Sequence, residues 1–199
     1  ILKGPSYALL GLAYSDINER VIRHTAERIL VSCGGSDPTN LTTLVLDGIN
    51  QISRSLDVRV IVGPLFDKKI RAALNSLVLN FGSSIELVDS PDMLVEHMKW
   101  CDVAIATTGL IKYELAATAT PAILISIDDV HDLVNGPFSA MGSVIDLGFN
   151  VTPEQVATNV SDLVDNYDLR VKLSMIGHKM IDGKGSERLV TEILRICHD

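Results

Sequence analysis

The stretch Ile29-Leu30-Val31-Ser32-Cys33-Gly34-Gly35-Ser36-Asp37-Pro38-Thr39-Asn40 decides the fold class. It begins with a short apolar run, turns at two adjacent glycines, and leads into an amphipathic pattern over residues 41–55. A run that is apolar at nearly every position is what a strand buried on both faces of a parallel sheet requires. The stretch therefore predicts a strand over residues 29–33, a tight turn and a helix.

The same pattern repeats along the chain. Further apolar runs follow at residues 58–62, 85–88, 103–106 and 122–125, with a weaker one at 143–146. Helical patterns separate them at 68–79, 93–100, 111–118 and 133–141, and helices alone follow at 153–166, 169–181 and 185–197. Thr152 before Pro153 and Ser90 before Pro91 are typical of helix starts. This alternation predicts an α/β fold: a doubly wound, Rossmann-like parallel sheet of about six strands with helices on both faces.

Composition excludes several classes of protein. The 199 residues are 47% hydrophobic and 21% charged, and 17 Lys and Arg against 25 Asp and Glu give a net charge of −8 with scattered cations. We therefore expect no nucleic-acid partner. No apolar run reaches the roughly 18 residues of a membrane span, and no signal peptide is apparent, so we expect a cytoplasmic location. The three cysteines lack metal-ligand spacing, which argues against a metal site.

Two loops are candidate ligand sites, because ligands of such sheets bind outside the carboxyl ends of the strands, where the strand order reverses. In the common order 3-2-1-4-5-6, the first and fourth strands flank that crevice. The first strand leads into Gly34, Gly35 and Ser36, whose backbone N–H groups could approach an anion. The alternative is a plain turn capped by Asn40 or Thr39, since the sequence is neither G-x-G-x-x-G nor a P-loop.

The fourth strand leads into the second candidate loop. Thr107, Thr108, Gly109 and Leu110 would offer hydroxyl and backbone donors to a pyrophosphate, and Glu114, one helical turn later, could accept hydrogen bonds from ribose hydroxyls. The alternative makes Thr107 or Thr108 a helix cap and Glu114 a solvated carboxylate of the first helical turn. The pattern alone leaves both readings open.

A third segment, Asp128-Asp129-Val130-His131-Asp132, follows the fifth strand and reads as a solvated loop. His131 is the most site-like histidine, and Asn135 lies just beyond it. No G-x-S-x-G elbow and no set of nucleophile, base and acid is apparent, so the catalytic residues are unknown and no cofactor is indicated. The chain reads as half of a site. It begins with Ile1 rather than Met, which leaves open that it is a piece of a longer protein.

Taken together, these motifs resemble the C-terminal nucleotide-binding domain of the GT-B fold, in particular the UDP-sugar hydrolases of the pseudaminic acid pathway and their relatives in spore coat polysaccharide synthesis and MurG-like transferases. The likeness rests on residues 32–40, on Lys112-Tyr113-Glu114-Leu115-Ala116-Ala117, and on residues 121–125 and 182–188. Residues 4–10 resemble the family's interdomain segment. The resemblance implies an interdomain segment and first helix over residues 1–28, followed by one domain over 29–199.

The resemblance also implies a function. Such a chain would bind UDP or a UDP-sugar through Gly34, Gly35, Ser36 and residues 107–110, with Glu114 on the ribose and His131 and Asn135 nearby. The family's general base belongs to an N-terminal half that has no counterpart here, so we expect an N-terminal or fused partner domain and little hydrolysis by this chain alone. The chain departs from the family pattern at Thr108, Ile111 and Val130-His131.

Two other classes of function remain open. One is a non-catalytic sugar-nucleotide-binding or regulatory domain derived from the same family. The other is a dinucleotide-dependent oxidoreductase, which the missing G-x-G-x-x-G motif and the lack of an acid at the end of residues 58–62 disfavour.

Overall fold

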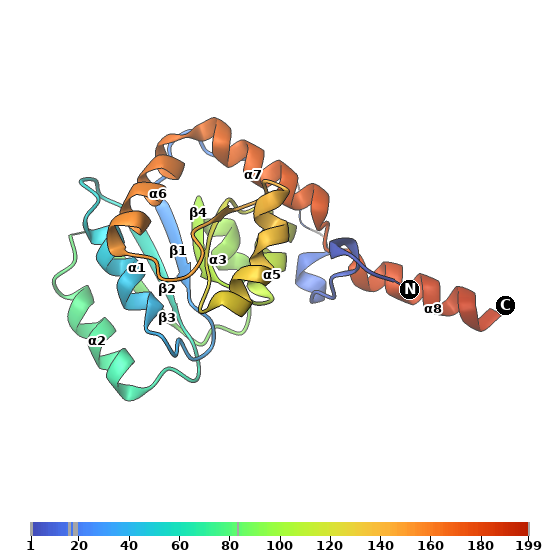
Figure 1. The fold of residues 1–199 in the computed structure, drawn as a ribbon, viewed down its shortest axis with the longest axis horizontal. Coiled ribbons are helices and arrows are strands. Elements are labelled where there is room, and N and C mark those ends of the chain that lie inside the picture. The colour runs from blue at the N-terminus through green and yellow to red at the C-terminus, as the bar shows by residue number, and fades with distance from the viewer. Residues whose placement is uncertain (1, 16, 18–19, 83, 199) are drawn as a thin grey trace.

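The centre of the molecule is a six-stranded parallel sheet, seen in the computed structural model, which describes residues 2–15, 17, 20–82 and 84–198 (Figure 1). Its strands lie in the order β3-β2-β1-β4-β5-β6, and every neighbouring pair is parallel. This is the common order 3-2-1-4-5-6 on which the choice of the two candidate loops depended. The strands are β1 (Arg28–Ser32), β2 (Asp57–Val62), β3 (Ser84–Asp89), β4 (Val103–Thr107), β5 (Ala122–Ile125) and β6 (Ile145–Asp146).

Helices cover both faces of the sheet, as the sequence predicted (Figure 1). They are α1 (Leu41–Asn50), α2 (Lys68–Val78), α3 (Val95–Trp100), α4 (Ile111–Ala117), α5 (Asp129–Ala140), α6 (Pro153–Asp165), α7 (Tyr167–Met180) and α8 (Gly185–His198).

Alternation along the strands divides the core between the two faces. In β1, Ile29 and Val31 pack with α1, α2 and α6, whereas Leu30 packs on the other face with α3, α4 and α5. The central strands β4 and β5 alternate in the same way. Since a strand buried on both faces must be apolar at both parities, this explains why the strands read as continuous hydrophobic runs.

Helix boundaries confirm one start signal and correct two others. Thr152 caps α6 through a capping box with Gln155, with Oγ1 accepting the Gln155 N–H at 3.3 Å. The start predicted at Ser90 is wrong: Ser90 has a φ of 44° directly after β3, and α3 begins at Val95. The acidic segment predicted as a loop is also helical, because Asp128 caps α5, which begins at Asp129.

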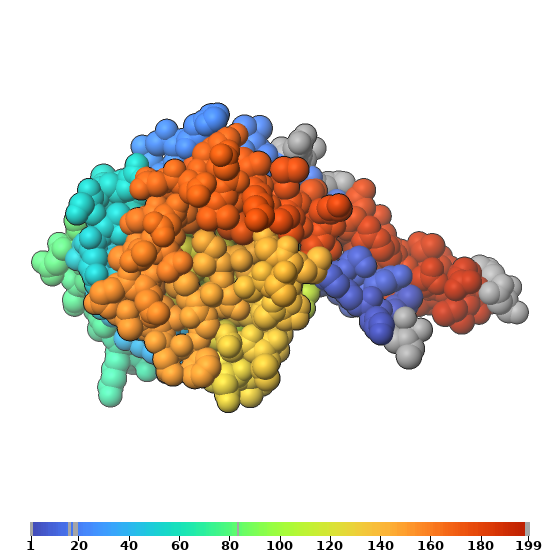
Figure 2. All heavy atoms as spheres, turned by 45° about the horizontal axis from the view of Figure 1, so that its top comes forward, coloured from blue at the N-terminus to red at the C-terminus, as the bar shows by residue number. Residues whose placement is uncertain are grey.

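The N-terminal segment, residues 2–15, lies beside α8, and together they form an extension of the main body (Figures 1 and 2). Before β1, the described residues contain two 3-10 turns, η1 (Pro5–Tyr7) and η2 (Leu12–Tyr14), where one helix was expected. Arg188 of α8 donates to the Ser6 carbonyl at 2.9 Å and also pairs with Asp182. Within the described residues, no helix has the length and apolar character needed to cross a membrane.

Candidate functional site

A cavity of about 270 Å³ lies at the carboxyl edge of the sheet, where the glycine-rich loop after β1 meets the loop after β4. Six of the predicted site residues line it: Gly34, Gly35, Thr107, Thr108, Gly109 and Leu110. The rest of the lining comes from Ser32, Ile61, Gly63, Pro64, Ser90, Pro91, Leu94 and Ile111. The two loops predicted from the sequence therefore lie at one site. None of the residues that line this cavity carries a charged side chain, so its polar groups are hydroxyls and backbone atoms.

Close packing of glycine backbones shapes one wall of this cavity. Gly34 has a φ of 85°, in the left-handed region that favours glycine. A Cβ atom on Gly63 would lie 2.3 Å from the Gly35 carbonyl oxygen, and that same oxygen accepts the Leu65 N–H at 2.9 Å. Ser36, the third predicted residue of this loop, is exposed and does not line the cavity.

The N-terminus of α1 is occupied by the protein's own carboxylate. Asp37, which is 1% exposed, accepts the Leu41 N–H at 2.7 Å and the Thr42 N–H at 2.9 Å. Asn40 adopts a φ of 55° and its side chain makes no capping hydrogen bond. The plain-turn alternative, in which Asn40 or Thr39 caps the helix, is therefore wrong about the cap. An anion in the cavity would thus meet the loop backbone rather than the first turn of α1.

The threonines of the loop after β4 do not cap helix α4. Leu110 occupies the N-cap position of α4 without a side-chain hydrogen bond, so neither Thr107 nor Thr108 caps the helix. Thr107 is buried at the end of β4, and its Oγ1 would lie 3.6 Å from a Cβ atom on Gly34. Its hydroxyl therefore lies where the two loops meet.

Behind this loop lies a buried polar cluster that the sequence reading only partly found. Asn135, fully buried in α5, donates from Nδ2 to Thr108 Oγ1 and to Ser126 Oγ, each at 3.0 Å. Its Oδ1 accepts a hydrogen bond from Lys112 Nζ at 3.2 Å, and Lys112 also donates to the Val134 carbonyl at 3.1 Å.

Lys112 belongs to a motif that carries the resemblance but was not predicted as a site residue, since a lysine in the first turn of a helix normally faces solvent. In the structure it is 1% exposed. Its Nζ lies 5.3 Å from the Phe138 ring centroid and 5.7 Å from that of Tyr113, which favours a cation. Burial lowers the pKa of Lys112, and the nearby Asp146 carboxylate acts in the opposite direction.

Glu114 does not line the cavity. It is half-buried and pairs with the hydroxyl of buried Tyr14 from η2. Burial raises the pKa of Glu114, and the hydrogen bond from Tyr14 partly opposes this shift. The ribose-binding role predicted for Glu114 therefore has a structural rival, which is to hold the N-terminal segment against α4.

His131 lies in the first turn of α5, beside the site rather than within it. Its Nδ1 is 2.6 Å from Asp128 Oδ1, which also accepts the His131 N–H at 2.8 Å. Those interactions hold the pKa of Asp128 below its usual range. His131 does not line the cavity. Burial raises the pKa of the Cys33 thiol to about 12, which favours the unreactive thiol form over the thiolate at neutral pH.

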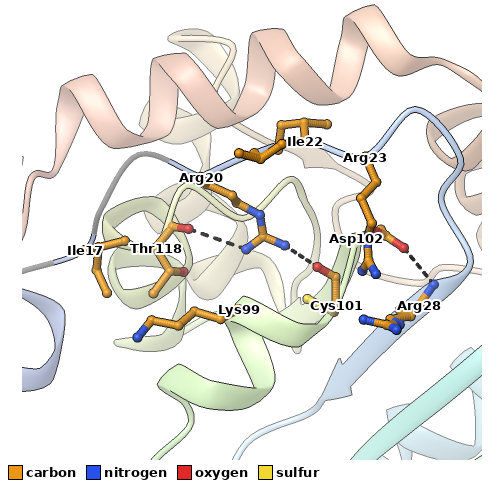
Figure 3. A pocket seen from close by; sticks show the side chains of 10 residues that line it. Ile17, Arg20, Ile22, Arg23, Arg28, Lys99, Cys101, Asp102 and Thr118 are labelled. Atoms are coloured by element: carbon orange, nitrogen blue, oxygen red, sulfur yellow. Dashed lines mark hydrogen bonds and ion pairs between the residues drawn. The ribbon is translucent and has the colours of Figure 1, made fainter.

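A larger cavity of about 460 Å³ opens at the opposite edge, near the amino ends of β1 and β4 (Figure 3). Two of the basic side chains that line it, Arg20 and Arg23, bind to groups of the protein itself. Arg20 donates to the Met98 carbonyl at 2.8 Å and to Thr120 Oγ1 at 2.7 Å, and Arg23 pairs with Asp102 at 2.7 Å. Since ligands of doubly wound sheets bind at the carboxyl edge, we place the candidate site in the smaller cavity.

Comparisons with known proteins agree with this architecture. The chain is 26% identical over 206 residues to the spore coat polysaccharide biosynthesis protein SpsG of Bacillus subtilis (strain 168), covering 100% of this chain and 59% of SpsG. A scan against protein-family models gives no match. The chain spans less than two thirds of the length of SpsG.

Solved structures share the fold. MurG of Acinetobacter baumannii superposes with a TM-score of 0.72 at 15% identity, over 92% of this chain and 52% of MurG. S. aureus MnaA, in a co-structure with UDP, superposes with a TM-score of 0.66 at 18% identity, over 88% of this chain and 47% of MnaA. The GT-B-like, Rossmann-like fold expected from the sequence is confirmed.

Proposed function

We propose that this chain is the nucleotide-binding half of a UDP-sugar hydrolase or glycosyltransferase of surface-glycan biosynthesis. The observation that carries the proposal is the cavity at the carboxyl edge of β1 and β4, lined by Gly34, Gly35, Thr107 and Thr108. Hydroxyl and backbone donors on a glycine-lined wall suit a diphosphate, which needs close approach and many hydrogen bonds. Likeness to a UDP-bound structure and to a polysaccharide biosynthesis protein supports the same choice.

In this proposal the chain binds the nucleotide without turning it over. Activating water needs a positioned general base, usually His, Asp or Glu. None of the residues that line the cavity has an ionisable side chain of this kind. His131 and Glu114 lie near the site, but the side chains they pair with are Asp128 and Tyr14, respectively.

A UDP-linked diacetamido-trideoxy sugar, as in the pseudaminic acid pathway, is the substrate class that the resemblance favours.

The missing base would come from a partner domain, N-terminal in the same protein or fused to it. Two apolar surfaces on the extension support a partner here. Val190, Ile193, Leu194 and Ile196 of α8 are each about half exposed or more, on the projecting helix of Figure 2. A cavity of about 540 Å³, with an apolar lining from the N-terminal segment, α4 and α5, lies at the base of the same extension.

Calorimetric titration with UDP tests the proposal. We expect saturable binding in the micromolar range, with much weaker binding of ADP or of uridine without phosphates. Absence of heat with UDP at concentrations up to the millimolar range, with the chain folded by circular dichroism, would contradict it.

A further inference from the structure

We propose that Asn135, oriented by the buried ammonium group of Lys112, fixes the hydroxyl of Thr108 as a hydrogen-bond donor toward an anion in the carboxyl-edge cavity. The inference rests on the proposed function for its anion, a nucleoside diphosphate. It assigns Asn135 and Lys112 as positioning residues, because neither lines the cavity and both act through Thr108.

The direction of every hydrogen bond in the cluster follows from Lys112. An ammonium group can donate and cannot accept. The amide atom of Asn135 that faces Lys112 Nζ at 3.2 Å must therefore be the carbonyl oxygen Oδ1. Since Asn135 is fully buried, an amide turned the other way would set two donors against each other without water to separate them.

Both amide hydrogens of Asn135 are then committed. Nδ2 carries two hydrogens and has two acceptors, Thr108 Oγ1 and Ser126 Oγ, each at 3.0 Å. A hydroxyl that accepts an N–H keeps its own proton for another acceptor. Ser126 has one inside the protein, because its Oγ donates to Asp132 Oδ1 at 3.3 Å.

Thr108 differs from Ser126 at this last step. Its hydroxyl donates to no acceptor in the described part of the chain, although its oxygen accepts from Asn135. Thr108 lines the cavity. The relay from Lys112 through Asn135 thus leaves one preset O–H donor available to the cavity. A donor held in place in advance loses little entropy when an anion binds, and hydrogen bonds to anions are stronger than those to neutral groups.

The substitution Asn135→Asp tests this directly, because it keeps the shape and reverses the hydrogen-bond direction. A carboxylate accepts only, so it would still pair with Lys112 but would draw in the protons of Thr108 and Ser126. We expect the Kd for UDP, measured by calorimetry, to rise about 10-fold or more, as in Thr108→Val. In the Thr108→Val background, Asn135→Asp should change the Kd by less than about 3-fold.

Ser126→Ala is the matched control, since it removes the other acceptor of the same amide and leaves the bond to Thr108. It should keep the Kd for UDP within about 3-fold of wild type. Equal weakening of UDP binding by Ser126→Ala and Asn135→Asp, or additive effects of Asn135→Asp and Thr108→Val, would overturn the inference.

If Asn135→Asp does not fold, the comparison of Thr108→Ser with Thr108→Val decides. The serine variant should retain affinity for UDP, and equal affinities of the two variants would overturn the inference. Titration with inorganic pyrophosphate separates this inference from the proposed function. A wild-type chain that binds neither pyrophosphate nor UDP contradicts both. A chain that binds them without coupling between Asn135 and Thr108 contradicts only this inference.

Discussion

The Asp37 carboxylate lies 2.7 Å from the backbone nitrogen of Leu41 and closes the N-terminus of α1 with a group from the protein itself. In a doubly wound sheet this helix start is the usual place for a phosphate. Here the carboxylate holds it, so the proposed ligand depends on the loop after β4 and on the glycine backbone between the two strands.

Replacing Asp37 should cost stability. Asp37→Ala leaves two buried N–H groups, those of Leu41 and Thr42, without an acceptor, and we expect the free energy of unfolding to fall by about 1–2 kcal/mol. Denaturant titration measures it. Asp67→Ala is the control, because Asp67 caps α2 in an exposed position and should cost less. Equal losses at the two positions would contradict the importance of burial.

Gly63 should tolerate no side chain. In Gly63→Ala the new Cβ atom would meet the Gly35 carbonyl oxygen at 2.3 Å, which must displace the glycine-rich loop. We expect lower thermal stability and weaker UDP binding. Gly136→Ala in α5 is the control, since nothing except its chain neighbours and the backbone of its own helix lies within 4 Å of its Cβ position, and it should leave UDP binding near wild type. Wild-type behaviour of Gly63→Ala would show that the loops do not pack as described.

Glu114 can be assigned by separating its two candidate roles. If it binds ribose, Glu114→Ala weakens UDP binding by about 1.5–3 kcal/mol, while Tyr14→Phe, which removes the Tyr14 hydroxyl, leaves the affinity near wild type. If it instead anchors η2, both variants lower the melting temperature and neither changes the Kd much. Calorimetry and thermal unfolding of the same two variants distinguish these outcomes.

The raised pKa of Glu114 also predicts a pH dependence. The carboxyl of Glu114 ionises near pH 4.5 in the unfolded chain and at a higher pH in the folded chain, so the folded state loses stability as the pH rises through the folded pKa. Glu114→Gln removes that loss. Its melting temperature relative to wild type should therefore be higher at pH 7 than at pH 4. A difference that is the same at both pH values would contradict the burial of this carboxylate.

Turnover by the chain alone should be very slow or absent. Incubation with UDP-sugars should release UDP at no appreciable rate, because general-base assistance is worth about 10²–10⁴-fold and no base lines the cavity. Rapid release of UDP that is lost in His131→Ala would show that the chain contains a complete site and that the half-site reading is wrong.

The sequence predicted the sheet well because its signal is local. Strands buried on both faces, such as β1 and β4, must be apolar at nearly every position, and their ends marked the two loops that meet at the cavity. The order of the strands is the common order of doubly wound sheets, so the alternation of strands and helices was enough to suggest it.

The misses depend on contacts made through space. Asp37 caps α1 because the loop turns back at a φ of 43°, whereas the sequence reading considered only Asn40 or Thr39 as caps. Lys112 is buried because α5 supplies Asn135 and the Val134 carbonyl, from more than twenty residues away. Ser90-Pro91 matched the pattern of a helix start, but Ser90 directly follows β3 and adopts a left-handed turn conformation, and α3 begins only at Val95.

The most direct test of the central claim is a titration of the isotope-labelled chain with UDP, followed by the backbone amide chemical shifts. We predict saturable shifts in the micromolar range at Gly34, Gly35 and residues 107–111, the backbone that lines the carboxyl-edge cavity. The opposite cavity near Arg20 and Arg28 should remain unchanged. Shifts confined to that opposite edge, or no saturable shifts anywhere, would contradict the account.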